Sequence, residues 1–255
     1  MDLGSLDAYV TALFLHLVRV GSFMTVVPFF GQQVDSYISR LVLAIAFASI
    51  FWWVGDQQVE VPGNLLALGV MAIREGVIGF ALGFAMSTLT SMLVSAGEIV
   101  SSEMGFSMAR TMNPESGTDA TVVSQLLQVL GFLLILQLDL HHEALRIVGD
   151  TFQACPVGQP FDVEPIWLGL RTLVAGSVAM ALQYVFPVLG IMMLLSIGMV
   201  LLGRAVPAIN LMEFGFALRV LAALGVTAFF LVESAPFLIS VFHAFLDQTR
   251  AMFGI

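Results

Sequence analysis

The chain has 255 residues, 59% of them hydrophobic and only 11% charged, and its formal net charge is −9. Soluble domains average about 25% charged residues, so this composition excludes an ordinary soluble domain and indicates a membrane protein. The nine basic residues are all arginines, and the negative net charge argues against nucleic-acid binding, which needs basic patches.

Six apolar blocks predict helices, because they are too long for strands and have the Leu-rich and Gly-rich composition of membrane helices. They cover Ala8–Phe30, Leu41–Val54, Leu65–Gly97, Val122–Leu138, Ile166–Gly203 and Val220–Leu246. The second block is short for a bilayer span, which needs about 20 residues. Polar breaks separate the blocks at Gly31–Arg40, Gly55–Asn64, Glu98–Asp119, Asp139–Glu164 and Arg204–Arg219. We therefore predict an all-α, membrane-associated fold.

The start of the chain and its cysteine content bear on how it reaches the membrane. The opening residues carry Asp2 and Asp7 and no basic region, so we do not expect a cleavable signal peptide. Cys155 is the sole cysteine, which excludes an intramolecular disulfide. We expect insertion through the chain's own apolar helices.

The third block continues into an unusually long helix candidate, Arg74–Glu103. As a helix it would be about 45 Å long, against about 30 Å of hydrocarbon. The arginines do not settle the orientation, because the loops on either side hold too few of them for the positive-inside rule. The hydropathy thus indicates a membrane location but predicts the topology poorly.

Small residues recur every four positions along this helix and predict a packing interface. Such a row lets a neighbouring backbone approach closely, and its drift of about 40° per step requires the partner helix to cross at an angle. The pattern does not say whether the partner belongs to the same chain, and incidental enrichment of small residues in membrane helices is the alternative. The row consists of Gly79, Gly83, Ser87, Ser91 and Ser95.

The loop Met104–Thr121 follows, polar and pliable between two apolar blocks. Met104, Met108 and Met112 are spaced by four, which places three flexible thioethers on one side of a helical turn. Pro114 ends any helix, since proline disfavours the α conformation of Asn113 before it. The loop is either a movable seal or an ordinary connector with incidental methionines.

Charged residues in or beside the apolar blocks should face protein or water rather than lipid, because a charge at bilayer depth costs several kcal/mol. They either form structural ion pairs and rim contacts or line an aqueous path. The candidates are Arg19, Arg74, Glu75, Glu98, Glu103, Arg204, Glu213, Arg219 and Glu233.

Catalysis is not expected. His141, His142 and Glu143 are consecutive, whereas a helical metal site needs the i, i+4 spacing of HExxH. His16 and His243 are isolated in apolar surroundings, and the sequence contains no phosphate loop or nucleophile elbow. We assign no catalytic residue, no metal and no cofactor.

Five motifs in order carry a resemblance to a known family. They are RVGSFMTVVPFFGQQVDSYISRLVLAIAFA (Arg19–Ala48), REGVIGFALGF (Arg74–Phe84), SAGEIVSSEMGFSMARTMNPESGT (Ser95–Thr118), LHHEALRIVGDTFQACPVG (Leu140–Gly158) and LLGRAVPAINLMEFGFALRVLAAL (Leu201–Leu224). The ordered set closely resembles the FliR family, flagellar export-gate proteins of bacterial type III secretion, over nearly the whole chain. The homologous injectisome family, which serves virulence secretion, is the runner-up.

The resemblance implies that one copy of the chain assembles with several copies of FliP and FliQ into a helical, inverted-cone gate at the flagellar basal body. It also implies a FliP-like part, Met1–Pro165, fused to a FliQ-like helical hairpin, Ile166–Ile255. The gate would lie in the inner membrane and project partly into the periplasm. FlhB would lie near the turn Arg204–Arg219, with FlhA nearby, and unfolded flagellar proteins would pass through the channel.

The resemblance further implies that the loop Gly105–Ala120 plugs the lumen. The corresponding plug and gate residues are Gly105, Phe106, Met108, Met112, Asn113 and Pro114. The competing classes are an independent multi-pass solute transporter, with Arg74, Glu75 or Glu233 in its substrate path, and a purely structural membrane scaffold.

Overall fold

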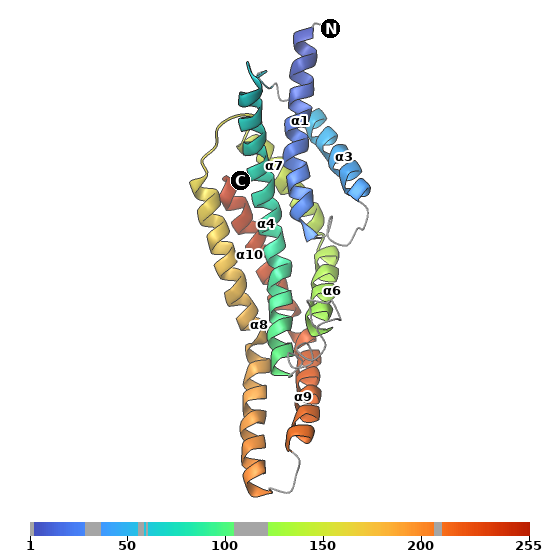
Figure 1. Ribbon diagram of the computed structural model, residues 1–255, viewed down its shortest axis with the longest axis vertical. Coiled ribbons are helices and arrows are strands. Elements are labelled where there is room, and N and C mark those ends of the chain that lie inside the picture. Colours follow the sequence, from blue (N-terminus) through green and yellow to red (C-terminus); the bar gives the residue numbers. More distant parts are fainter. Residues whose placement is uncertain (1–2, 29–36, 56–58, 60, 105–121, 207–210) are drawn as a thin grey trace. The chain divides into compact units, whose positions relative to one another are not determined.

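The computed structural model describes residues 3–28, 37–55, 59, 61–104, 122–206 and 211–255 (Figure 1). The described residues form eight α-helices, and their secondary structure is otherwise turns and irregular segments, which confirms the all-α prediction. The helices are α1 (Leu3–Val26), α3 (Tyr37–Gly55), α4 (Leu65–Glu103), α6 (Val122–Gln137), α7 (Leu140–Ala154), α8 (Glu164–Ala205), α9 (Leu211–Glu233) and α10 (Ala235–Phe253).

Polar residues and prolines set the starts of the two longest helices. The Asn64 side chain accepts a hydrogen bond from the Ala67 N–H at 2.7 Å and so caps the start of α4. At the start of α8, Pro165 lies in the first turn, where a missing N–H costs nothing. Pro187 lies inside α8 and removes one internal hydrogen bond, yet the helix continues to Ala205.

Three differences from the predicted blocks concern helix length and number. Helix α4 has 39 residues: it begins at Leu65, as the third block does, and continues past Gly97 to Glu103, so it is longer than both the block and the helix candidate Arg74–Glu103. The last predicted block, Val220–Leu246, falls in two helices, because α9 ends at Glu233 and α10 begins at Ala235. The segment Asp139–Glu164, expected to be a polar break, contains α7, whose buried residues Leu140, Ala144, Ile147, Val148 and Thr151 recur at helical spacing.

The chain divides into two compact units, each with its own core. Unit 1 comprises Met1–Leu89, Ile135–Val174 and Ala244–Ile255, and Figure 1 shows α3 lying beside α1 within it. Its core includes Leu15, Phe23, Ile78, Leu82 and Phe152. Unit 2 comprises Thr90–Leu134 and Ala175–His243, and its core includes Met92, Leu93, Val100, Val185 and Phe242.

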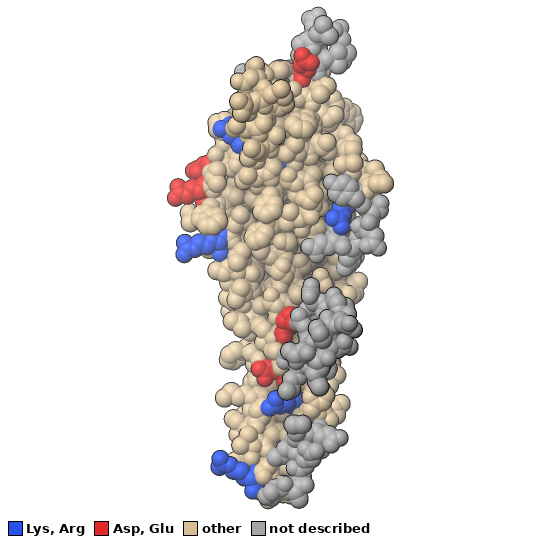
Figure 2. All heavy atoms as spheres, viewed as in Figure 1, with Lys and Arg blue, Asp and Glu red and all other residues tan. Residues whose placement is uncertain are grey.

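Many large apolar side chains of the described helices are exposed, as expected for a protein covered by lipid or by other subunits. On the face in Figure 2, acidic and basic side chains are few and scattered. Four helices, α1, α3, α4 and α8, are long and apolar enough to cross a membrane. The number of spans rises to six if the bent pairs α6–α7 and α9–α10 each count as one.

Candidate functional site

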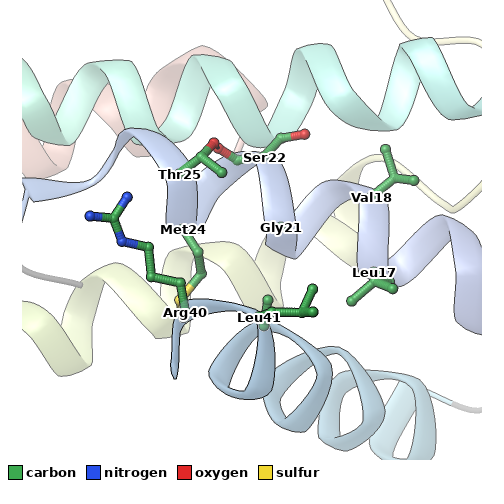
Figure 3. Close-up of a pocket in the computed structure, with 9 residues that line it drawn as sticks. Leu17, Val18, Gly21, Ser22, Met24, Thr25, Arg40 and Leu41 are labelled. Atoms are coloured by element: carbon green, nitrogen blue, oxygen red, sulfur yellow. The ribbon is translucent and has the colours of Figure 1, made fainter. Parts of the chain in front are cut away.

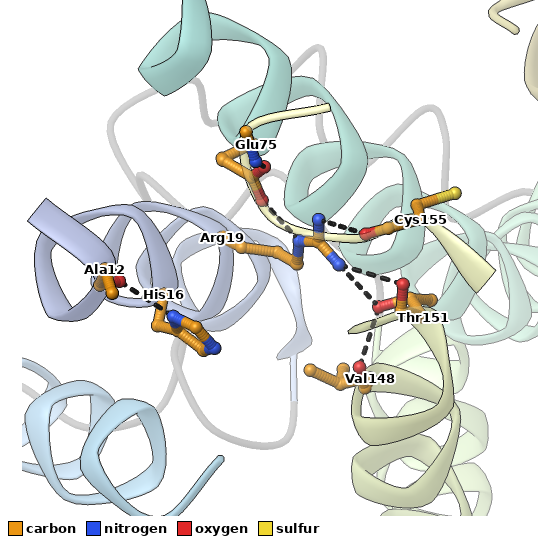
Figure 4. Close-up of polar contacts among 8 residues, drawn as sticks. Ala12, His16, Arg19, Glu75, Val148, Thr151 and Cys155 are labelled. Carbon is orange, nitrogen blue, oxygen red and sulfur yellow. Dashed lines mark hydrogen bonds and ion pairs between the residues drawn. The ribbon is translucent and has the colours of Figure 1, made fainter. Parts of the chain in front are cut away.

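A buried ion pair joins α1 to α4 in the core of unit 1 (Figure 4). The Nε of Arg19 donates to Oε2 of Glu75 at 2.6 Å, and the two side chains are 0% and 1% exposed. Both residues are among the charges for which the sequence predicts either structural ion pairs or an aqueous path, but 56 positions separate them, and the sequence does not identify the two as partners. Because each charge has an opposite partner, neither is left uncompensated in an apolar region.

The rest of the Arg19 guanidinium binds the carboxyl end of α7. Its Nη1 donates to the Thr151 carbonyl oxygen at 3.0 Å and to Thr151 Oγ1 at 3.4 Å, and its Nη2 donates to the Cys155 carbonyl at 2.8 Å. The last carbonyls of a helix carry its negative partial charge, so a cation stabilises them, even though the Thr151 carbonyl also accepts the Cys155 N–H at 2.8 Å. Arg19 therefore anchors α7 to α1.

Glu75 also accepts a hydrogen bond on its second carboxylate oxygen. Its Oε1 accepts the Gly158 N–H at 2.9 Å, in the segment that follows α7. Gly158 has a φ of 79°, a left-handed conformation that glycine adopts without the steric cost of a Cβ. The carboxylate thus fixes the chain immediately after α7, as the guanidinium fixes its end.

Aromatic rings enclose this polar network. The Arg19 Cζ lies 4.4 Å from the centroid of the Phe152 ring, a cation–π arrangement, and Phe152 stacks on His16 at 4.6 Å between centroids. The His16 Nδ1 donates to the Ala12 carbonyl at 2.7 Å, one turn earlier in α1. Phe51 of α3 closes the other side at 5.6 Å from Phe152. The network is therefore shielded from solvent.

Cys155 belongs to the same network through its carbonyl, and its thiol is half-buried. Burial raises the pKa of this thiol above its usual range, while the nearby Arg19 cation lowers it. A thiol with a raised pKa is a poor nucleophile at neutral pH. The groups of this network hold helices together, and Cys155 is not an activated nucleophile. We therefore assign the network no catalytic role.

The small-residue row divides into two parts. A Cβ built on Gly79 would overlap the Arg19 carbonyl oxygen, and one built on Gly83 would lie 2.8 Å from the Phe23 carbonyl oxygen. Both glycines therefore pack against the backbone of α1 in the same chain. Farther along α4, Ser87 is half-buried and donates to the Phe84 carbonyl at 2.9 Å, while Ser91 and Ser95 are exposed.

In unit 2 a second close approach joins α4 to α6. The Glu98 Oε1 accepts a hydrogen bond from Ser124 Oγ at 2.9 Å, and Gly97 leaves no room for a Cβ beside the Ser124 backbone. The two sides of this contact flank the predicted plug in the sequence: Gly97 and Glu98 come before it, and Ser124 comes after it. Met104, the first methionine of the series, is fully buried.

Among the side chains that the structure describes, the other predicted charges do not join one site. Arg219 donates to Ser196 Oγ at 3.2 Å within unit 2, Arg204 and Glu233 are exposed, and Arg74 and Glu103 are half-buried. The side chain of Glu213 and the plug residues Gly105, Phe106, Met108, Met112, Asn113 and Pro114 lie outside the described residues.

The turn between α6 and α7 gathers a second polar cluster, Asp139, His141 and His142. Asp139 adopts a left-handed φ of 54°, and its carboxylate pairs with His142 Nδ1 at 3.3 Å. The ligand atoms of the three residues lie within 4.8 Å of one another. Asp139 and His142 are exposed, so we describe the cluster as a surface hydrogen-bonded group.

Comparison with known proteins finds relatives that match the chain over most of its length. The sequence profile described as bacterial export proteins, family 1, matches residues 10–249. The chain is 28% identical to the flagellar biosynthetic protein FliR of Buchnera aphidicola subsp. Acyrthosiphon pisum, covering 90% of this chain and 88% of the relative. It is 29% identical to that of Caulobacter vibrioides, with 87% and 88% covered, and 26% identical to that of Escherichia coli K12, with 90% and 88% covered.

Proposed function

The chain belongs to the FliR family of bacterial export proteins, and on that basis we propose that it is a structural and gating subunit of the flagellar type III protein export channel. Family membership confirms the resemblance inferred from the sequence motifs. It makes the chain a non-enzymatic membrane component of the flagellar export apparatus. The observation that carries the proposal is the family match over residues 10–249.

The geometry of the charged residues supports a gate subunit over an independent solute transporter. A transporter places ionisable groups where a substrate or ion can reach them. Glu75, one candidate for such a role, is 1% exposed and bound by both Arg19 and Gly158. This pair fixes helices together, so Glu75 is not available to a substrate.

We propose FliP and FliQ as the partners that cover the exposed apolar surface, with FlhB near the connection of α8 to α9 and FlhA close by. The sequence predicted a turn over Arg204–Arg219 at this place, but α9 already begins at Leu211. The FliP-like part would be Met1–Pro165 and the FliQ-like hairpin Ile166–Ile255. The length of α4 supports partial projection into the periplasm, since 39 residues make a helix of about 58 Å against about 30 Å of hydrocarbon. The relatives named above are all flagellar proteins, which favours the flagellar over the injectisome system.

We also propose that Gly105–Ala120 plugs the lumen, with Phe106, Met108 and Met112 as its sealing side chains. The test replaces this loop with a Gly/Ser segment of equal length in the assembled gate. Ion and small-molecule leakage across the membrane should rise, because a flexible polar segment cannot form an apolar seal. Leakage is measured with reconstituted vesicles, and the yield of the purified complex is measured alongside.

The control for the loop replacement is Gln159→Ser, which changes an exposed residue of a different loop and should leave leakage unchanged. Wild-type leakage from a loop variant that assembles normally would refute the plug and leave the scaffold interpretation. Loss of assembly in the loop variant would show that the loop is part of the packing instead.

A further inference from the structure

A groove of about 350 Å³ lies between α1 and α3 in unit 1 and takes no part in the ion-pair network (Figure 3). Its volume is at the lower end of the roughly 300–1,000 Å³ that ligand pockets occupy, which suits one acyl chain better than a bulky solute. It is lined by Leu17, Val18, Gly21, Ser22, Met24, Thr25, Arg40, Leu41 and Ala44.

The groove is polar at one end and apolar at the other. Figure 3 places Arg40 near Met24 and Thr25 at one end and Leu17 and Val18 at the opposite end. Gly21 lies between them, and a Cβ built on Gly21 would meet nothing within 4 Å. An elongated ligand with one charged end matches this gradient.

The charge at the polar end selects an anion. Arg40 lies in the first turn of α3, where the helix dipole is positive. A guanidinium carries five N–H donors, so it can bind a phosphate alongside other contacts. Arg40 and the helix start therefore favour the same sign of ligand charge.

The flanking helices indicate where the ligand comes from. Both α1 and α3 are candidate membrane spans, and only 11% of the apolar window of α3 is buried within the chain. In the isolated chain, a groove between two such helices opens to lipid. An amphiphile from the bilayer therefore fits better than a water-soluble anion.

We propose that this groove binds one anionic phospholipid, with its phosphate on the Arg40 guanidinium and one acyl chain lying over Gly21 toward Leu17 and Val18. The site would fix the angle between α1 and α3 by filling the space between them. It does not depend on the chain's role in export.

The test uses the full-length chain reconstituted into nanodiscs of equal amounts of phosphatidylglycerol and phosphatidylcholine. Lipids that stay bound after release into detergent are counted by native mass spectrometry. The wild type should retain phosphatidylglycerol preferentially. Arg40→Gln should lower that preference about tenfold, the factor that one hydrogen bond to a charged group supplies.

Gly21→Leu should abolish retention, because its side chain would fill open space in the groove without a clash. Gly176→Leu is the matched control, since Gly176 also lies inside a helix with open space around it but does not line the groove. Equal retention of both lipids by the wild type would overturn the proposal. The proposal would also be overturned if both groove variants retained as much phosphatidylglycerol as the wild type. This holds even if the two variants lowered the yield of a protein complex, since the groove would then serve a protein contact.

Discussion

Replacing Arg19 with leucine is expected to destabilise unit 1 by about 3–5 kcal/mol, the usual cost of removing one partner of a buried ion pair. The loss leaves the Glu75 carboxylate, 1% exposed, with the Gly158 N–H as its remaining hydrogen-bond donor. It also removes the guanidinium donors to the carbonyls of Thr151 and Cys155 at the end of α7, leaving the Thr151 carbonyl with the Cys155 N–H at 2.8 Å. The melting temperature of the chain in detergent measures the effect.

The single cysteine provides a local readout of the same change. Burial is the larger influence on the Cys155 thiol and raises its pKa, whereas Arg19 lowers it. If α7 stayed docked, losing Arg19 alone would raise the pKa further and slow thiol labelling. If the end of α7 comes loose, exposure lowers the pKa and labelling becomes faster. We expect faster labelling of Arg19→Leu, since the docking of α7 depends on that guanidinium.

Arg146→Leu is the control, because Arg146 is 76% exposed and pairs with Glu143 at 3.3 Å on the surface of α7. Exposed pairs contribute little, so its melting temperature should match the wild type. The double variant Arg19→Leu with Glu75→Leu should be less destabilised than the sum of the two single changes, because no unpaired charge remains. Additive losses, or a wild-type melting temperature for Arg19→Leu, would show that the pair does not hold the core together.

How far the sequence predicts this site depends on the kind of group involved. Arg19 and Glu75 are recognisable because a charge inside an apolar block is rare. Their pairing with each other cannot be recognised from the sequence, since it depends on how α1 crosses α4. Apart from the Thr151 hydroxyl, the partners at Thr151, Cys155 and Gly158 act through backbone groups, which every residue carries. The side chains there therefore do little to mark the contact in advance.

The helices show a similar division. Continuous apolar runs reveal α1, α3 and α8, but α7 is amphipathic and its polar residues hide it among the loops. Its buried residues Leu140, Ala144, Ile147 and Val148 have the 3.6-residue period that a reading of apolar runs overlooks. The end of α9 at Glu233 also has a signal in the sequence, because Glu233 and Pro236 place a charge and a proline inside one apolar block. The helical period of the buried residues in α7 is the feature of the sequence that predicts this helix.

Replacing Gly83 with leucine is expected to destabilise the chain itself by about 1–3 kcal/mol, before any subunit binds. A Cβ at this position would lie 2.8 Å from the Phe23 carbonyl oxygen and 2.9 Å from Val26 Cβ, and a backbone carbonyl cannot move aside as a flexible side chain can. The sequence predicted a close packing interface here without identifying the partner, and the structure places α1 of the same chain against Gly83. Melting of the chain expressed alone measures the effect.

Ser95→Leu is the matched comparison, since Ser95 lies in the same row of small residues but is exposed. The change should leave the melting temperature of the isolated chain near that of the wild type. If the exposed part of the row contacts a neighbouring subunit, Ser95→Leu should lower the yield of the complex with FliP and FliQ, because close backbone approach is lost. A Gly83→Leu chain that melts like the wild type yet fails to assemble would contradict this division. The whole row would then serve contacts between subunits. Glycine at position 83 would be required by a neighbouring subunit and not by the crossing of α1.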